Sequence, residues 1–235
     1  MQQGVVDLQR SDPVLAQGFL GVQMADLRRA QGRLGELEGA VKSFLALIPL
    51  PAYRAVLALV YQEQDRREEA RALFDELAKD DFAVFDDGQR PISLALLTDV
   101  CCYLDDHPRA AVLYELLLPM ADHCVAVAGM SFQGSASAPL GVLATTLGRF
   151  DDAERHFEDA IAMNRKMRAP RWVAVTQLSY AQMLLRCAGA GDRERALGML
   201  DEAIAAAEAF GMKALLDQAT ALRAAAPDAD GAGAR

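Results

Sequence analysis

Apolar residues recur along the chain at intervals of three and four, and this spacing gathers them on one face of an α-helix. The pattern continues through most of the sequence and predicts a chain built from helices. The last expected helix carries its apolar residues on one face, as a helix does when it closes the end of a stack. The expected helices lie at 13–31, 34–47, 51–64, 66–79, 91–104, 108–120, 138–147, 150–167, 170–187, 192–210 and 212–225.

Turn-forming residues stand where these helices are expected to begin and end. Gly32 and Gly148 lie between paired helices, where glycine readily adopts the left-handed backbone conformation that ends a helix. Pro108 lies just inside a predicted helix start, where its missing N–H costs nothing. Asp65, with Glu68 three residues later, has the spacing of an N-cap acid and its partner, and predicts a helix start there.

The predicted helices come in pairs, and the pairs repeat. A leucine precedes the small alanine of the second helix by the same interval in three successive pairs, Leu57 to Ala70, Leu97 to Ala110 and Leu140 to Ala153. Two weaker copies flank these three. The second-helix position therefore recurs at Leu37, Ala70, Ala110, Ala153 and Ala196, at intervals of 33 to 43 residues.

The best copy has a Leu-Gly pair in its first helix and a small–aromatic–small series in its second, as Leu140, Gly141, Ala153, Phe157 and Ala160. This order resembles the tetratricopeptide repeat. A small residue lets the two helices of a pair approach, and the aromatic ring one turn later fills the gap between neighbouring pairs. The resemblance covers roughly residues 13–210.

The resemblance implies an all-α fold, a right-handed α-solenoid of about five antiparallel helix pairs with a C-terminal capping helix. We expect this helical-repeat domain to span residues 1–226 and a small polar, disordered tail to span 227–235. Three segments, 116–119, 146–160 and 191–197, are also similar to the C-terminal helical region of actinobacterial regulators. Those proteins carry an ATPase module with a cyclase or a helix-turn-helix domain, and the sequence contains neither. This likeness implies a regulatory or scaffolding role without catalysis.

Composition and charge narrow the class of protein further. Apolar residues make up 52% and charged residues 24%, as in folded soluble domains, and a net charge of −9 argues against direct binding of nucleic acid. No run of apolar residues is long enough for a transmembrane helix, and residues 1–7 lack the features of a secretory signal. The cysteines, Cys101, Cys102, Cys124 and Cys187, lie in settings that suit reduced thiols, so we expect a cytoplasmic protein.

None of the standard phosphate-binding, zinc-protease or nucleophile motifs occurs in the sequence. His107, His123 and the nearby cysteines match no standard zinc spacing. His156 lies among charged residues and is expected on the solvated surface. The acidic pairs at 86–87 and 105–106 are expected to cap helices or to face solvent. We therefore expect no enzyme activity, no cofactor and no metal.

The first predicted helix is apolar on nearly all sides, with Val14, Leu15, Phe19, Leu20, Val22 and Met24. A solenoid needs a polar terminal cap to stay soluble, and only residues 1–12 are available to form one. Two outcomes stay open. Residues 1–12 fold back over this helix, or the helix buries against another surface, such as a second copy of the chain in a homodimer.

The segment 121–137 is an insertion between two repeats, apolar at first and then rich in Gly and Ser. It is either an insert that contacts a ligand, or a short extra helix and a flexible link that only lengthens the stack. In the first case Ser131, Gln133 and Ser135 would be hydrogen-bond donors to the ligand. Trp172 after Arg171 is either a stacking residue for a ligand or part of the packing.

The first helix of each tetratricopeptide pair lines the concave groove, so helical spacing identifies the groove positions. Most are small and apolar. The remaining candidates for binding are Asp26, Arg29, Gln62, Asp99, Cys102, Thr145 and Gln182. Such a groove suits a helical peptide or a modest organic molecule. The sequence therefore predicts a protein or peptide partner for an interaction or scaffold module, with a small-molecule sensor as the alternative.

Overall fold

The computed structural model describes residues 13–86, 88–127 and 130–226, with side chains from residue 16 onward. Within this part the chain forms two compact units. Unit 1 contains the residues up to 113 together with 124–133, and unit 2 contains 114–123 together with the residues from 134 onward. The expected terminal segments 1–12 and 227–235 lie outside the described residues, and the predicted extent of the repeat domain stays a prediction.

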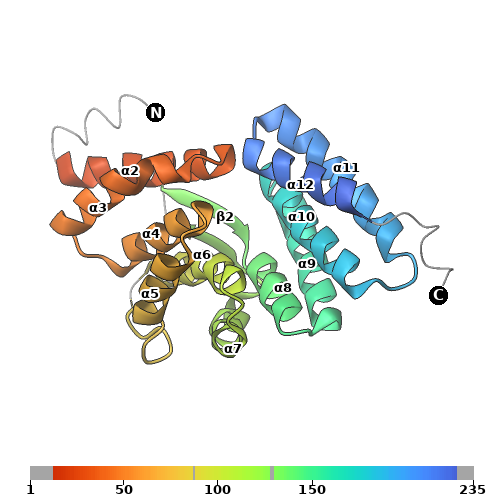
Figure 1. Ribbon diagram of the computed structural model, residues 1–235, viewed down its shortest axis with the longest axis horizontal. Coiled ribbons are helices and arrows are strands. Elements are labelled where there is room, and N and C mark those ends of the chain that lie inside the picture. Colours follow the sequence, from red (N-terminus) through yellow and green to blue (C-terminus); the bar gives the residue numbers. More distant parts are fainter. Residues whose placement is uncertain (1–12, 87, 128–129, 227–235) are drawn as a thin grey trace. The chain divides into compact units, whose positions relative to one another are not determined.

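Unit 1 consists of packed helices and most of a short hairpin (Figure 1). Helix α4 packs against α3, α5 and α6, and strand β1 packs against α6. The division between the units falls within α7 and within β2. The elements are α2 (Pro13–Gln31), η1 (Leu34–Leu37), α3 (Glu38–Leu47), α4 (Pro51–Glu63), α5 (Arg67–Leu77), α6 (Arg90–Tyr103), α7 (His107–Leu117), β1 (Cys124–Val127) and β2 (Ser131–Ser135).

Unit 2 stacks each helix on the next, and α10 packs against both α9 and α11 (Figure 1). Its elements are η2 (Leu118–Met120), α8 (Ser137–Thr146), α9 (Phe150–Lys166), α10 (Pro170–Cys187), α11 (Asp192–Phe210) and α12 (Lys213–Ala225). The all-α prediction is confirmed, and most predicted helix ends lie within two or three residues of those observed. The right-handed sense of the solenoid stays a prediction.

A close approach between glycine and an aromatic ring holds α8 against α9. A Cβ placed on Gly141 would lie 2.7 Å from the ring of Phe157, and Phe157 itself is fully buried. The Phe157 ring also stacks on Tyr180 of α10, with centroids 5.3 Å apart. The ring that the repeat pattern places between neighbouring pairs thus contacts both α8 of its own pair and α10 of the next.

Unit 1 uses arginine side chains as well as apolar packing to join its helices. Ala70 and Phe74 of α5 are fully buried, in the positions that the repeat pattern gives to a small and an aromatic residue. Arg67 donates hydrogen bonds to the carbonyl oxygens of Tyr103 and Leu104, at 2.7 and 2.9 Å. These carbonyls lie where α6 ends, and a positive charge is favourable at the C-terminal end of a helix.

The predicted turns are correct at most positions and wrong at one. Gly32 and Gly148 both have positive φ, 68° and 72°, as expected where a helix ends. Asp106 accepts a hydrogen bond from the backbone N–H of Arg109 at 3.2 Å and caps α7. Asp65 does not cap α5, because its own φ is 54° and its carboxylate accepts a hydrogen bond from the Tyr103 hydroxyl instead.

The insertion contains a two-stranded sheet, β1 and β2, so the alternative of a short extra helix in 121–137 is wrong. In β1 the side chains of Val125 and Val127 are covered, whereas those of Cys124 and Ala126 are exposed. This alternation is the period of two that a strand imposes. The β-branched valines at alternate positions favour the strand over a helix.

The expectation that His156 lies on the solvated surface is also wrong. Its side chain is only 3% exposed, and its Nε2 shares a hydrogen bond of 2.9 Å with the hydroxyl of Tyr114. Both residues belong to unit 2. Burial and the neighbouring charge of Arg155 lower the pKa of His156 below its ordinary value of 6.5.

We predict that Gly141→Ala destabilises unit 2 by about 1–3 kcal/mol, because the added methyl group meets the buried Phe157 ring. Urea unfolding followed by the fluorescence of Trp172, the single tryptophan of the chain, measures this change. Gly198→Ala in α11 is the matched control, since a Cβ there meets nothing within 4 Å. The control should be neutral or stabilising, and equal destabilisation by both substitutions would contradict the packing argument.

We predict that burial of neutral His156 makes unit 2 less stable as the pH falls below about 6.5. The unfolded chain then binds a proton at this histidine, whereas the lowered pKa keeps the folded form neutral. His156→Gln keeps a partner for Tyr114 and should flatten the dependence of the free energy of unfolding between pH 7.5 and 5.5. His107→Gln, at an exposed histidine, is the control and should leave the dependence unchanged.

Candidate functional site

Unit 1 contains a cavity of about 610 Å³. Its walls come from α2, η1, α3, α4 and α6 and from the hairpin formed by β1 and β2. Most of the lining side chains are aliphatic or aromatic, and the main apolar ones are Leu34, Val41, Phe44, Leu47, Leu50, Tyr53, Val56, Leu59 and Ile92. The cavity is therefore suited to an apolar group, because moving apolar surface from water into apolar surroundings is favourable.

Small residues on α2 keep this cavity open. Gly18, Gly21 and Ala25 are spaced three and four residues apart, share one face of α2 and line the cavity. A Cβ on Gly21 would meet no atom within 4 Å, whereas one on Gly18 would lie 3.2 Å from the hydroxyl oxygen of Tyr53. The middle of this helix face therefore has no side chain to fill the space opposite it.

Helix α3 forms a wall that is apolar and yet poorly covered. None of the residues of α3 is buried, although the helix includes Val41, Phe44, Leu45 and Leu47. Phe44 contacts Tyr53 of α4, with ring centroids 4.7 Å apart, and Leu47 is 70% exposed. An apolar helix normally buries one face in a core, so α3 leaves part of its apolar surface available to another group.

A group of polar side chains, which we call the polar cluster, adjoins the apolar walls. It consists of Asp26 and Arg29 of α2, Asp99 of α6, and Ser131 and Gln133 of β2. The Ser131 hydroxyl donates to Asp26 Oδ2 at 2.7 Å, and Gln133 Nε2 donates to Asp26 Oδ1 at 2.8 Å. Both donors are about 9% exposed, so the Asp26 carboxylate is held by fixed, largely buried partners.

Arg29 joins the polar cluster to α6 by an ion pair with Asp99. Asp26, Arg29, Ser131 and Gln133 line the cavity, and Asp99 contacts it through Arg29. The polar cluster contains two carboxylates and one guanidinium. The structure thus brings together five of the residues predicted as binding candidates.

The other predicted candidates of unit 1 do not line the cavity, as far as the described residues show. Gln62 is half-buried on α4, and its buried Oε1 has no hydrogen-bond partner among the described side chains and backbone. Cys102 is half-buried on α6, beside the fully buried Cys101. Burial raises the pKa of the Cys101 thiol well above its ordinary range, so that thiol is unreactive at neutral pH.

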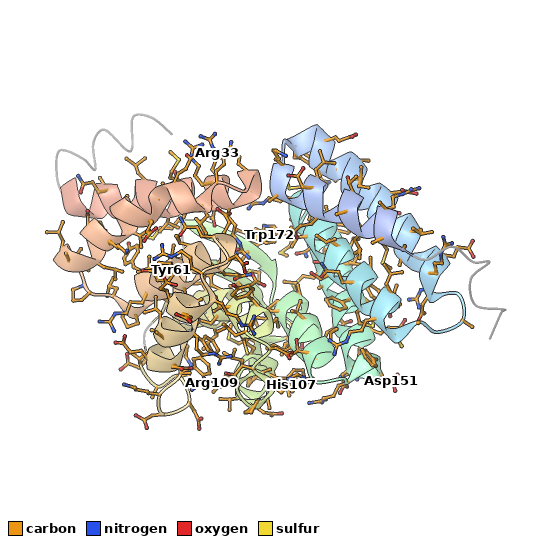
Figure 2. The ribbon with its side chains drawn as sticks, in the orientation of Figure 1. Arg33, Tyr61, His107, Arg109, Asp151 and Trp172 are labelled. Atoms are coloured by element: carbon orange, nitrogen blue, oxygen red, sulfur yellow. The ribbon has the colours of Figure 1, made fainter. Side chains whose placement is uncertain are left out.

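The predicted candidates of unit 2 lie elsewhere in the chain. Ser135 is fully buried, and its backbone N–H donates to Asn164 Oδ1 at 3.0 Å. Trp172, labelled in Figure 2, packs closely on Gly134, because a Cβ added to Gly134 would lie 3.0 Å from the Trp172 side chain. The guanidinium carbon of Arg171 lies 5.0 Å from the centre of the Trp172 ring. Thr145 donates to the Gly141 carbonyl oxygen at 2.8 Å. The last candidate of this unit is the exposed Gln182 on α10.

Residues that the sequence did not single out form most of the cavity wall. They include Gly21, Phe44, Leu47 and Tyr53. A signal for them exists, because the helix at 34–47 has more apolar residues than one buried face requires. Together with the glycines of the preceding helix, that excess points to an apolar surface with an incomplete core.

The described residues contain no group of three or more side chains that could hold a metal ion. None of the helices in the described part of the chain combines the length and apolarity needed to cross a membrane. The cavity itself combines apolar walls with one polar cluster, as small-molecule and peptide sites in proteins do.

One family model matches part of the chain, a tetratricopeptide repeat over residues 140–167. The match falls on α8 and α9, the pair joined by Gly141 and Phe157. The fold is thus helical and similar to tetratricopeptide repeats, which suggests a module for protein–protein interaction. No curated protein and no solved structure matches the chain. The likeness to bacterial regulators receives no support from these comparisons.

We predict that the cavity binds a neutral apolar dye, Nile red, and that Gly21→Phe reduces this binding. Gly21 lines the cavity and a Cβ there meets no atom within 4 Å, so a ring added at this position narrows the space available to the dye. Gly198→Phe, on the exposed face of α11, is the matched control and should keep the dye fluorescence of the original chain. Equal dye fluorescence in all three proteins would contradict an accessible cavity in unit 1.

Proposed function

We propose that this chain is a regulatory or scaffolding module that binds a partner protein, and that the cavity of unit 1 receives the apolar face of a helix of that partner. The observation that carries the proposal is the apolar surface that the described residues leave uncovered around the cavity. Leu20, Met24 and Leu47 line it and are 40%, 41% and 70% exposed. Soluble proteins seldom leave such clusters uncovered unless another group binds there.

A helix is the partner element that suits these walls. Leu20 and Met24 are one turn apart on α2, and Phe44 and Leu47 are nearly one turn apart on α3, so both walls present side chains at helical spacing. An amphipathic helix places apolar side chains at i, i+3, i+4 and i+7 and can fill such a groove. Each buried Å² of apolar surface contributes about 25 cal/mol, so a few large side chains supply the affinity.

The match to a tetratricopeptide repeat supports the coarser part of this proposal, since repeats of this kind generally bind proteins or peptides. The regulatory or scaffolding role is the finer part of the proposal, and binding of a partner at the cavity is the means that we propose for it. A cytoplasmic location suits the free cysteines of the described residues and belongs to the same proposal.

The volume of the cavity favours a second candidate, a sensor for a small organic molecule. Pockets for such ligands usually measure about 300–1,000 Å³ and combine apolar walls with a few placed polar groups. The cavity of unit 1, at about 610 Å³, meets both conditions. A sensor would be stabilised by its ligand in thermal unfolding and would not bind a helical peptide.

We predict that a 16-residue amphipathic model peptide, with leucines at i, i+3, i+4 and i+7 and otherwise Ala and Gln, binds the full chain. Leu47→Glu places a charge on the apolar wall and should weaken binding at least about tenfold, measured by fluorescence anisotropy of the labelled peptide. Gly21→Phe should weaken it to a similar extent by filling the cavity.

Phe210→Glu is the matched control, because Phe210 is another large exposed apolar residue, on α11 of unit 2. It should leave the affinity for the peptide unchanged. The proposal is wrong if the original chain does not bind the peptide, or if Leu47→Glu and Phe210→Glu affect binding equally. Thermal stabilisation by small apolar compounds without peptide binding would support the sensor instead.

A further inference from the structure

We infer that Tyr53 gives the cavity a chemical preference, because its hydroxyl donates a hydrogen bond to the side-chain carbonyl oxygen of a glutamine or asparagine on the helix that unit 1 receives. This inference rests on the proposed function, since it names the chemistry of the partner at the same site. The observation that carries it is a hydroxyl without a partner. Tyr53 lines the cavity, and its hydroxyl makes no hydrogen bond to the part of the chain that the structure describes.

Two contacts hold the Tyr53 side chain in place. Its ring packs against Phe44 of α3, with centroids 4.7 Å apart. Its hydroxyl oxygen lies against α2, 3.2 Å from the position that a Cβ on Gly18 would take. The hydroxyl of this α4 residue is thus positioned by contacts to two other helices of the cavity wall. An aromatic side chain has few rotatable bonds, so little entropy is lost when its hydroxyl pairs with a bound group.

The wall that α4 contributes to the cavity is apolar apart from this hydroxyl. The other described residues of α4 that line the cavity are Ala52, Val56 and Leu59. The polar cluster lies farther along α2, because Gly18 precedes Asp26 by eight residues, which corresponds to about 12 Å of helix. The hydroxyl is therefore a second polar point of the cavity, apart from the polar cluster.

The Tyr53 hydroxyl is protonated near neutral pH and is available as a donor. Burial raises the pKa of Tyr53 above its ordinary value of 10. The amide carbonyl oxygen of glutamine or asparagine is a neutral acceptor that such a donor can pair with. A carboxylate of the partner would also accept, but moving a charge onto apolar walls costs far more than moving a neutral amide. The neutral amides are therefore the side chains that suit this point.

An occupant without an acceptor would leave the hydroxyl without a hydrogen bond. A helix packed on the cavity walls displaces water, and a polar group that loses its water without a replacement disfavours binding. Sites built around a hydrogen-bonding group reject apolar analogues for this reason. One glutamine or asparagine within an otherwise apolar stripe therefore matches the cavity better than a wholly apolar stripe.

The experiment compares Gln with Met in the helical model peptide, because these residues have similar length and similar helix propensity. Each stripe leucine is replaced in turn by Gln or by Met, and binding to the full chain and to Tyr53→Phe is measured by fluorescence anisotropy. At one stripe position we expect Tyr53→Phe to reduce the affinity of the Gln peptide relative to the Met peptide about fivefold. A change of less than about twofold at every stripe position would overturn the inference.

Tyr61→Phe is the matched control, because Tyr61 also lies on α4 but is not one of the residues that line the cavity (Figure 2). This substitution removes a hydroxyl from the same helix and should leave the ratio of the two affinities unchanged at every stripe position. An equal effect of Tyr61→Phe and Tyr53→Phe would overturn the inference.

Thermal unfolding of the free chain tests whether the Tyr53 hydroxyl lacks a partner before binding. Tyr53→Phe should unfold at the same temperature as the original chain, because no hydrogen bond is lost. Tyr180→Phe, in contrast, removes a hydroxyl that donates to Glu154 Oε1 at 2.8 Å and should unfold at a lower temperature. An equally large decrease in Tyr53→Phe would show that its hydroxyl already has a partner, and would overturn the inference.

The outcomes separate this inference from the proposed function. If Leu47→Glu abolishes binding and Tyr53→Phe leaves the ratio unchanged, the cavity binds a helix without this hydrogen bond, and only the inference fails. If none of the peptides binds, the proposed function fails and the inference fails with it. Thermal stabilisation by small carbonyl compounds without peptide binding would assign the acceptor to a small molecule and overturn the inference. A mass that doubles with concentration and reverts in Gly21→Phe would identify a second copy of the chain as occupant and would also overturn it.

Discussion

The packing of this chain depends on small residues that let one helix approach an aromatic ring on the next. Gly141 does this for Phe157, whose ring also stacks on Tyr180 of α10. In unit 1, by contrast, Gly21 lines the cavity, and a Cβ placed on it would meet no atom within 4 Å. Glycine therefore lies at a close helix contact in unit 2 and beside open space in unit 1.

The polar cluster depends on a different kind of interaction, a contact between residues that are far apart in the sequence. Asp26 and its donors Ser131 and Gln133 are separated by more than 100 positions and meet only because β2 returns to unit 1. The insertion therefore contributes polar atoms to a wall that the helices alone would leave apolar.

Much of this architecture follows from the sequence, because helical periodicity and turn residues are local signals. The helices and the left-handed glycines at 32 and 148 were predicted on that basis, and the groove positions 26 and 29 do line the cavity. His156 was misplaced because its charged neighbours outweighed the helical spacing that aligns it with buried Ala153 and Ala160. The strands were missed because the alternation in β1 covers only four residues. The contact between Asp26 and β2 has no local signal and could not be predicted.

The path of the chain through the two units has a consequence for the order in which the cavity is completed. Unit 1 is interrupted, since the chain leaves it after residue 113 and returns for 124–133. During synthesis the helices around the cavity emerge first, and the donors Ser131 and Gln133 can reach Asp26 only when β2 has left the ribosome. Until then the nascent cavity is apolar and lacks the donors that orient the carboxylate. In this order of synthesis, β2 is the segment that completes the polar cluster.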